Sequence, residues 1–409
     1  MGARCSSWPS TSSDPATPVA KRSLLGAWTR LLNRSGQALT RAAVKQHKAL
    51  LKSAGQAAAK TTAKTAAKRA AKPAAARKKA TPKAAPRSAA PRRPATRAGR
   101  IVQPALQALA EQQRFPRASG DWLPGLAVGP AGARRFTLYR PAALRGGLLA
   151  RLPPAPLVVM LHGCAQNGRD LAFSSRMHGL ADRHGFFVLY PEQDTLAHPQ
   201  GCWRWYDVRA GHAQAEAQTL QLMVDQVCLR HPVDRRRVAV AGLSAGAGMA
   251  ALMATREPLR YAAVVMHSGV APGSGRSTAT GLQAMRGHGR VALPEGPVPP
   301  PLLVLHGTAD RLVDPVNGRN SVQAWAQAHG ARTGTARQVQ RGARHAMTVT
   351  DHRGPGRRLV ARLCEIDGLG HAWSGGAADQ AHSDPQGPDA TALAWAFLQA
   401  CFRQASGTT

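Results

Sequence analysis

The feature that most constrains the fold is an alternation of short apolar runs with helical stretches from about residue 134 onward. The runs are FTLY (136–139), PLVVMLHG (156–163), FFVLYPE (186–192), RVAVAG (237–242), YAAVVMHSG (261–269) and PLLVLHG (301–307). Because these runs are continuously apolar, they are typical of strands that are covered on both faces. Helical candidates lie between and after them at 170–184, 212–231, 246–256, 318–330 and 389–403. The alternation predicts an α/β fold with a doubly wound, mostly parallel sheet.

Two later segments, RHAMTVTDH and RLVARLCEI, flank the turn sequence Gly354-Pro355-Gly356. Apolar segments separated by such a turn predict a β-hairpin. In a doubly wound sheet, ligands bind and chemistry occurs at the carboxyl ends of the parallel strands. Candidate functional residues are therefore sought just after the apolar runs.

Positive charge is concentrated in the first hundred residues. Of the 409 residues, residues 1–100 hold 11 Lys, 12 Arg and a single acid, Asp14, and they contain every lysine in the chain. From about residue 53 to 100 no large apolar side chain occurs, so burial cannot offset the entropy of ordering. The sequence predicts a largely disordered basic arm over 1–100, a linker over 101–132 and a folded domain over 133–404.

Within the arm, apolar residues near 21–52 recur at helical spacing beside arginines, which predicts a short amphipathic helix. That helix either packs on the main domain or seeks a surface. A segment of this charge is expected to bind nucleic acid or an anionic surface. A solubilising tail without a fixed partner is the alternative.

No apolar run reaches the roughly 18 residues that a membrane span requires, so no transmembrane segment is expected. The first 20 residues are mostly small and polar, and they lack the apolar core of a secretory signal. Six cysteines without a CxxC pair favour neither a disulfide scaffold nor a zinc site. We expect no metal and no organic cofactor.

The strongest local motif is Gly242-Leu243-Ser244-Ala245-Gly246, which follows an apolar run directly and precedes an Ala-rich helical stretch. A GxSxG sequence at a sharp strand-to-helix turn exposes its serine as a nucleophile. The surrounding strand and helix make a chance match improbable. Ser244 is therefore the predicted nucleophile.

A serine nucleophile needs a base to take its proton and a carboxylate to orient that base. Asp310 follows the run PLLVLHG, and His371 lies in the glycine-rich segment after CEIDG. Serine, acid and histidine thus occur in the chain order that accompanies this turn. Asp314 is the competing acid, but Asp310 lies nearer the strand end.

The other required part is a pair of backbone N–H groups that stabilise an oxyanion. One comes from the residue after the nucleophile, Ala245, and one from the loop after an earlier strand. In His162-Gly163-Cys164, the Cys164 N–H is the better placed donor. His162 and His306 both occur as His-Gly at strand ends, where an imidazole commonly bonds the loop backbone.

The motifs HGCAQN (162–167), GCWRWYD (201–207), GLSAG, HGTADRLVDP and GLGHAW occur in one order. In these motifs, residues 115–404 resemble short-chain polyhydroxyalkanoate depolymerase esterases, relatives of feruloyl and acetylxylan esterases with the α/β-hydrolase fold. The resemblance implies the triad Ser244, Asp310 and His371. It also implies that Trp203 and Trp205 border the substrate pocket, and it brings Cys164 and Cys202 together as a disulfide.

The expected activity is that of a serine esterase acting on short-chain hydroxyacid esters. Feruloyl or acetylxylan-type hydrolysis is the alternative within the same family. A protein that chiefly binds nucleic acid or an anionic surface, with a vestigial esterase domain, is the alternative from another class. The resemblance implies an extracellular location, whereas the absence of a recognisable signal peptide and of a C-terminal polymer-binding domain favours the cytoplasm and argues against attack on crystalline polymer.

Overall fold

The computed structural model describes residues 114–146 and 153–407. The basic arm and the amphipathic helix near 21–52 lie outside the described residues. In the described part, no helix is both long enough and apolar enough to cross a membrane.

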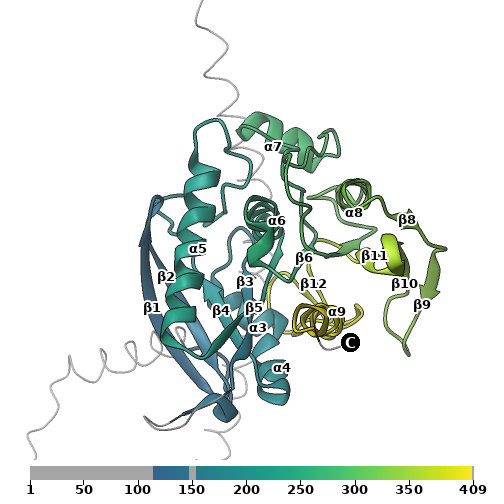
Figure 1. Ribbon diagram of the computed structural model, residues 1–409. Helices are drawn as coiled ribbons and strands as arrows, with labels where there is room; N and C mark the ends of the chain where they lie inside the picture. The colour runs from purple at the N-terminus through teal and green to yellow at the C-terminus, as the bar shows by residue number, and fades with distance from the viewer. Residues whose placement is uncertain (1–113, 147–152, 408–409) are drawn as a thin grey trace, which may run out of the picture. The chain divides into compact units, whose positions relative to one another are not determined.

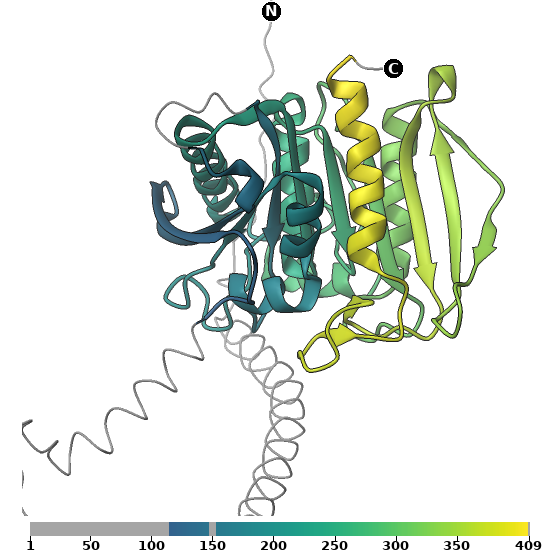
Figure 2. The same ribbon diagram turned by 90° about the horizontal axis from the view of Figure 1, so that it is seen from below.

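The described domain is built on a mixed sheet whose strands follow the order β1-β2-β4-β3-β5-β6-β7-β11-β10-β8, with β9 also paired to β10 (Figures 1 and 2). Pairing is parallel from β4 through β3, β5, β6 and β7 to β11, and antiparallel toward both edges. The predicted doubly wound, mostly parallel sheet is therefore confirmed. The strands are β1 Asp121–Gly129, β2 Gly132–Arg140, β3 Ala155–Leu161, β4 Phe187–Pro191, β5 Val233–Leu243, β6 Ala263–His267, β7 Leu302–Gly307, β8 Arg332–Thr333, β9 Arg337–Val339, β10 Met347–Arg353 and β11 Leu359–Ile366.

Helices cover both faces of this sheet. Helices α3, α4 and α9 pack on one face, and α5, α6 and α8 pack on the other (Figures 1 and 2). Two short strands, β12 Trp373–Ser374 and β13 Ser383–Asp384, form a separate parallel pair. The helices are α3 Gly168–Ser175, α4 Met177–His184, α5 His212–Arg230, α6 Ala245–Arg256, α7 Thr278–Met285, α8 Val316–Ala328 and α9 Ala390–Ala405, with short 3-10 turns at Ala142–Leu144, Pro258–Arg260 and Pro355–Arg357.

Burial explains why the central strands were recognisable from sequence. Every residue of β3, β4, β6 and β7 is buried, so each of these strands had to be continuously apolar or small, apart from a terminal His-Gly or His. The predicted hairpin is also confirmed, because β10 and β11 pair antiparallel around the Gly354–Gly356 turn. The six apolar runs are therefore the six strands β2 to β7.

Three boundaries differ from the sequence predictions. The segment 101–132, expected to be a linker, contains β1, which pairs with β2 along its whole length. β1 lacks an apolar run because it is an edge strand, with Leu126 and Val128 exposed. The helix predicted over 170–184 is two helices, interrupted at Arg176, whose backbone is left-handed (φ 53°). Helix α7 was not predicted, and the short strands β8, β9, β12 and β13 were also missed.

Candidate active site

Ser244 occupies a strained turn between β5 and α6. Its backbone has φ 57° and ψ −119°, a conformation that non-glycine residues rarely adopt. A Cβ atom added to Gly242 would lie 2.3 Å from the backbone carbon of Gly246, and one added to Gly246 would lie 2.1 Å from the Leu161 carbonyl oxygen. Both glycines are therefore required by the close approach of β5, α6 and β3, and the turn presents Ser244 at the carboxyl end of the sheet.

His371 and Asp310 are brought together by neighbouring strands. Asp310 follows β7, His371 follows β11, and these two strands pair in parallel. The distance between His371 Nδ1 and Asp310 Oδ2 is 2.7 Å. The other carboxylate oxygen, Oδ1, accepts the backbone N–H groups of Leu312 and Val313 at 2.9 and 3.0 Å. Both oxygens of this buried carboxylate are thus occupied, and one of them orients the imidazole.

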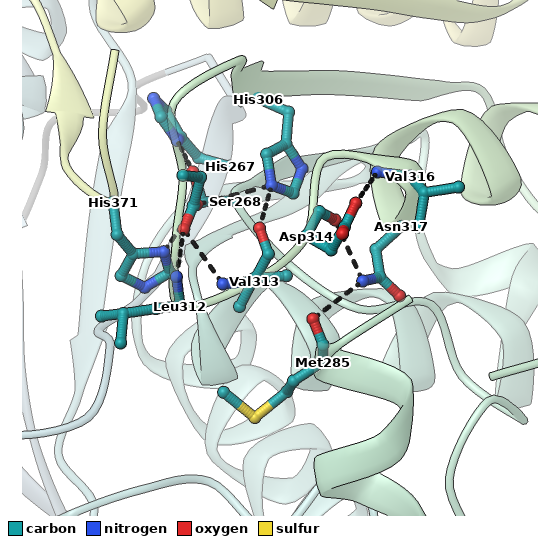
Figure 3. A network of polar contacts seen from close by, with 11 residues as sticks. His267, Ser268, Met285, His306, Leu312, Val313, Asp314, Val316, Asn317 and His371 are labelled. Atoms are coloured by element: carbon teal, nitrogen blue, oxygen red, sulfur yellow. Dashed lines mark hydrogen bonds and ion pairs between the residues drawn. The ribbon is translucent and has the colours of Figure 1, made fainter. Parts of the chain in front are cut away.

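The competing acid, Asp314, lies on the far side of the same loop (Figure 3). Its Oδ1 accepts the Val316 N–H at 2.9 Å, and its carbonyl accepts the side-chain amide of Asn317. These bonds tie Asp314 to the start of α8. No contact between Asp314 and His371 occurs among the described residues, so the geometry favours Asp310.

Two further histidines lie beside the Asp310 carboxylate. His306 is fully buried, and its Nε2 donates to the Val313 carbonyl at 3.0 Å and lies 3.4 Å from Asp310 Oδ2 (Figure 3). Burial alone would raise the pKa of Asp310, but hydrogen bonds from His306 and His371 outweigh it and hold that pKa well below its usual value. Asp310 is therefore ionised at every pH at which the protein is expected to work.

His267 supports the nucleophile turn and the His371 loop together. Its carbonyl accepts the Ser244 N–H at 2.9 Å, and its Nε2 accepts the Ser374 N–H at 3.1 Å. Because burial lowers the pKa of His267 to about 3, the ring is neutral, with its remaining proton on Nδ1 and directed to the Ser268 hydroxyl (Figure 3). His267 acts here as a structural support.

The HGC loop lies directly against the serine. A Cβ atom at Gly163 would be 3.4 Å from the Ser244 Cβ and 3.5 Å from the Leu243 carbonyl oxygen. Cys164 forms a disulfide with Cys202, with a Cα–Cα distance of 4.3 Å. The predicted donor loop and the GCW segment are thus covalently joined at the carboxyl end of the sheet.

The two tryptophans implied as pocket residues are buried side chains. Trp203 has no exposed surface, and its ring centroid lies 5.3 Å from that of His162. A side chain without accessible surface cannot touch a ligand in this conformation, so the pocket role expected of Trp203 is corrected to one of packing beneath the loop. Trp205 is 5% exposed and lies against Gly248 of α6, which leaves it a candidate for the pocket wall.

Sequence reasoning missed a buried polar cluster behind the HGC loop. The cluster consists of Arg134, Gln166, Gln193 and Glu216, none of which is more than 7% exposed. Gln193 lies at the end of β4 and links Arg134 to the Glu216 carboxylate. The only available signal was the polar pair Glu192-Gln193 at the end of an apolar run, since the partners are far apart in the chain. In the described residues, no group of three or more potential ligands forms a metal site.

The fold and this arrangement of residues define the described domain as an α/β-hydrolase with a site of the serine-hydrolase type. The domain superposes on an acetyl xylan esterase from Aspergillus awamori with a TM-score of 0.50 at 20% identity, covering 61% of this chain and 93% of that one, which shows a common fold. Residues 135–337 match the model of the family described as esterase PHB depolymerase. The chain belongs to this family of carboxylic ester hydrolases.

Two curated relatives lie within reach of sequence comparison. One is poly(3-hydroxyalkanoate) depolymerase C of Paucimonas lemoignei, 32% identical over 195 residues, which cover 43% of this chain and 45% of the relative. The other is a probable acetylxylan esterase A of Aspergillus clavatus, 30% identical over 208 residues, which cover 45% of this chain and 65% of the relative. The match spans less than two thirds of either relative.

Proposed function

We propose that the protein is a serine esterase in which Ser244, His371 and Asp310 form the catalytic triad. The observation that carries this proposal is the 2.7 Å bond between His371 Nδ1 and the buried Asp310 carboxylate, formed at the same end of the sheet as the strained Ser244 turn. This bond fixes a proton on Nδ1 and leaves Nε2 free to accept the serine proton. No metal ion or organic cofactor enters the reaction.

The reaction proceeds in two halves. His371 takes the proton of Ser244 as the hydroxyl attacks the ester carbonyl, and the resulting oxyanion is stabilised by the N–H groups of Cys164 and Ala245. The imidazolium, stabilised by Asp310, then protonates the leaving alcohol, and an acyl-enzyme remains on the serine. Water activated by His371 attacks the acyl-enzyme, releases the carboxylic acid and restores the free hydroxyl.

For the substrate, we propose esters of short-chain hydroxyacids, including oligomers of polyhydroxybutyrate. Membership of the esterase PHB depolymerase family and the similarity to a poly(3-hydroxyalkanoate) depolymerase support this choice. The similarity to a probable acetylxylan esterase supports acetylated glycan, or a feruloyl ester, as the alternative. A panel of hydroxybutyrate oligomers, acetylxylan and a feruloyl ester, compared by kcat/KM, decides between them.

The triad is tested by Ser244→Ala and His371→Ala. Each should lower kcat on a chromogenic butyrate ester by several orders of magnitude while the melting temperature stays close to that of the unchanged protein, since triad members act as a unit. A Ser244→Ala protein that kept more than about a tenth of the activity would overturn the assignment, because a tenfold change corresponds to only about 1.4 kcal/mol.

A second candidate function is electrostatic tethering by residues 1–100. The concentration of all 11 lysines in this segment supports it, because the remaining 309 residues carry their basic charge on arginine alone. A polyanion such as nucleic acid, or an anionic granule or envelope surface, would release counterions on binding. A protein that bound DNA tightly but hydrolysed no ester in the substrate panel would favour a binding protein with a vestigial esterase domain.

A further inference from the structure

Gly163, the residue before the proposed oxyanion donor, has both of its backbone polar groups held by side chains. Its N–H donates to Gln166 Oε1 at 3.1 Å. Its carbonyl oxygen accepts from His162 Nδ1 at 2.8 Å. The carbonyl of Gly163 and the N–H of Cys164 belong to one planar trans peptide, in which they point in opposite directions. Fixing the Gly163 carbonyl therefore fixes the direction of the Cys164 N–H.

The proton that makes this bond is placed by a third group. The backbone N–H of Gln193, at the end of β4, donates to His162 Nε2 at 3.1 Å. Nε2 is thus an acceptor, and the neutral ring carries its proton on Nδ1, facing the Gly163 carbonyl. His162 has no exposed surface, and burial lowers its pKa to about 4. The imidazole is therefore neutral, in the Nδ1–H form, at neutral pH.

Gln193 is itself held on both ends of its side chain. Arg134 Nε donates to Gln193 Oε1 at 2.9 Å, and Gln193 Nε2 donates to Glu216 Oε1 at 2.7 Å and to the Cys202 carbonyl at 3.1 Å. Cys202 is joined to Cys164 by the disulfide. The loop that carries the Cys164 N–H is thus anchored covalently on one side and through His162 on the other.

We propose that His162 and Gln166 are positioning residues that orient the Cys164 N–H toward the oxyanion formed at Ser244. The close approach of Gly163 to Ser244, which leaves no room for a side chain, places this peptide beside the attacking hydroxyl. Neither side chain exchanges a proton with the substrate. The inference rests on the proposed esterase function, because it assigns the two residues to the oxyanion hole of that reaction.

The test compares His162→Asn with His162→Leu in the full-length protein. The Asn side chain carries its Nδ2 donor near the place of the imidazole Nδ1, whereas Leu has a similar size and no donor. His162→Leu should lower kcat on a chromogenic butyrate ester by about ten- to a hundredfold, a partial loss of the 10²- to 10³-fold effect of one oxyanion donor, with KM within about threefold. His162→Asn should recover most of that loss. Gln166→Met, which removes the acceptor for the Gly163 N–H, should act in the same direction as His162→Leu.

A transition-state mimic separates positioning from general damage. A trifluoromethyl ketone forms a tetrahedral oxyanion on the serine, so its affinity should fall in parallel with kcat in His162→Leu. The matched control is His178→Leu, which removes another buried histidine, packed on Trp122 and Tyr139 away from the HGC loop. It should leave kcat and inhibitor affinity unchanged, even where it lowers the melting temperature.

Three results would overturn the proposal. They are an unchanged kcat in a folded His162→Leu protein, equal losses in His162→Leu and His162→Asn, and an Nε2–H tautomer for His162. The tautomer is read from ¹⁵N resonances of the histidine rings, assigned by the signal that His162→Asn removes, and this measurement does not depend on activity. An unmodified protein that hydrolysed no ester, with His162 in the Nδ1–H form, would instead overturn the proposed function and leave the anchored loop geometry intact.

Discussion

Exchanging the triad acid for its amide tests the proposed chemistry most sharply. In Asp310→Asn, one side-chain oxygen must still accept the N–H groups of Leu312 and Val313, which Oδ1 accepts at 2.9 and 3.0 Å in the acid. The amide oxygen therefore takes that place, and the NH₂ group faces His371. An NH₂ group donates to Nδ1, so the ring proton moves to Nε2, the atom that should accept the serine proton.

The expected loss follows from this tautomer reversal. The corresponding Asp-to-Asn exchange in a serine protease lowers kcat about 10⁴-fold with the geometry intact. We expect a loss of about 10³- to 10⁴-fold here, equivalent to about 4 to 5.5 kcal/mol of transition-state stabilisation. Initial rates on a chromogenic butyrate ester provide the measurement, and a melting curve shows whether the variant folds.

The same loop supplies the control, Asp314→Asn. Asn can keep the one side-chain bond that Asp314 makes, because its amide oxygen can accept the Val316 N–H in place of Oδ1. This variant should retain activity within about threefold. A greater loss at Asp314 than at Asp310 would reverse the assignment of the acid and refute the reasoning from the 2.7 Å bond.

The remaining predictions concern the disulfide, acid stability and the basic arm. Peptide mapping without reduction should find Cys164 and Cys202 linked, and reduction should lower the free energy of unfolding by about 3 to 4 kcal/mol for a sequence separation of 38 residues; free alkylation of both thiols in the native protein would contradict this. The pKa of His162 is lowered from 6.5 to about 4, so below pH 6.5 the unfolded chain binds a proton that the folded protein refuses, and stability falls as the pH falls. Between pH 6 and 4.5 the free energy of unfolding of His162→Asn should therefore fall less steeply, by about 1.4 kcal/mol per pH unit, whereas equal slopes in urea titrations would show that His162 titrates normally. Deleting residues 1–100 should leave turnover of a soluble ester unchanged but abolish retention on DNA or anionic vesicles at low salt, and retention of the full-length protein should weaken steeply between about 50 and 200 mM salt; equal retention of both proteins would end the tether proposal.

Local sequence pattern determined the central sheet and the position of the candidate nucleophile. A strand buried on both faces must be continuously apolar, so the runs that became β2 to β7 were visible without any knowledge of their neighbours. The GLSAG segment carries its own geometry, since Gly242 and Gly246 touch across the turn that holds Ser244. The edge strand β1 was missed because it is covered on one side only and lacks an apolar run.

Tertiary structure decided which partners these residues meet. Asp310 and Asp314 are four residues apart in one loop, and only the pairing of β7 with β11 brings His371 to Asp310. The clamp on Gly163 likewise depends on β3 lying beside β4, which places Gln193 next to His162 across 31 positions of sequence. Periodicity and turn motifs depend on neighbours along the chain, whereas a hydrogen-bond partner depends on strand order. The sequence alone therefore determined the elements and the nucleophile turn, and the packed sheet decided the acid and the support of the oxyanion loop.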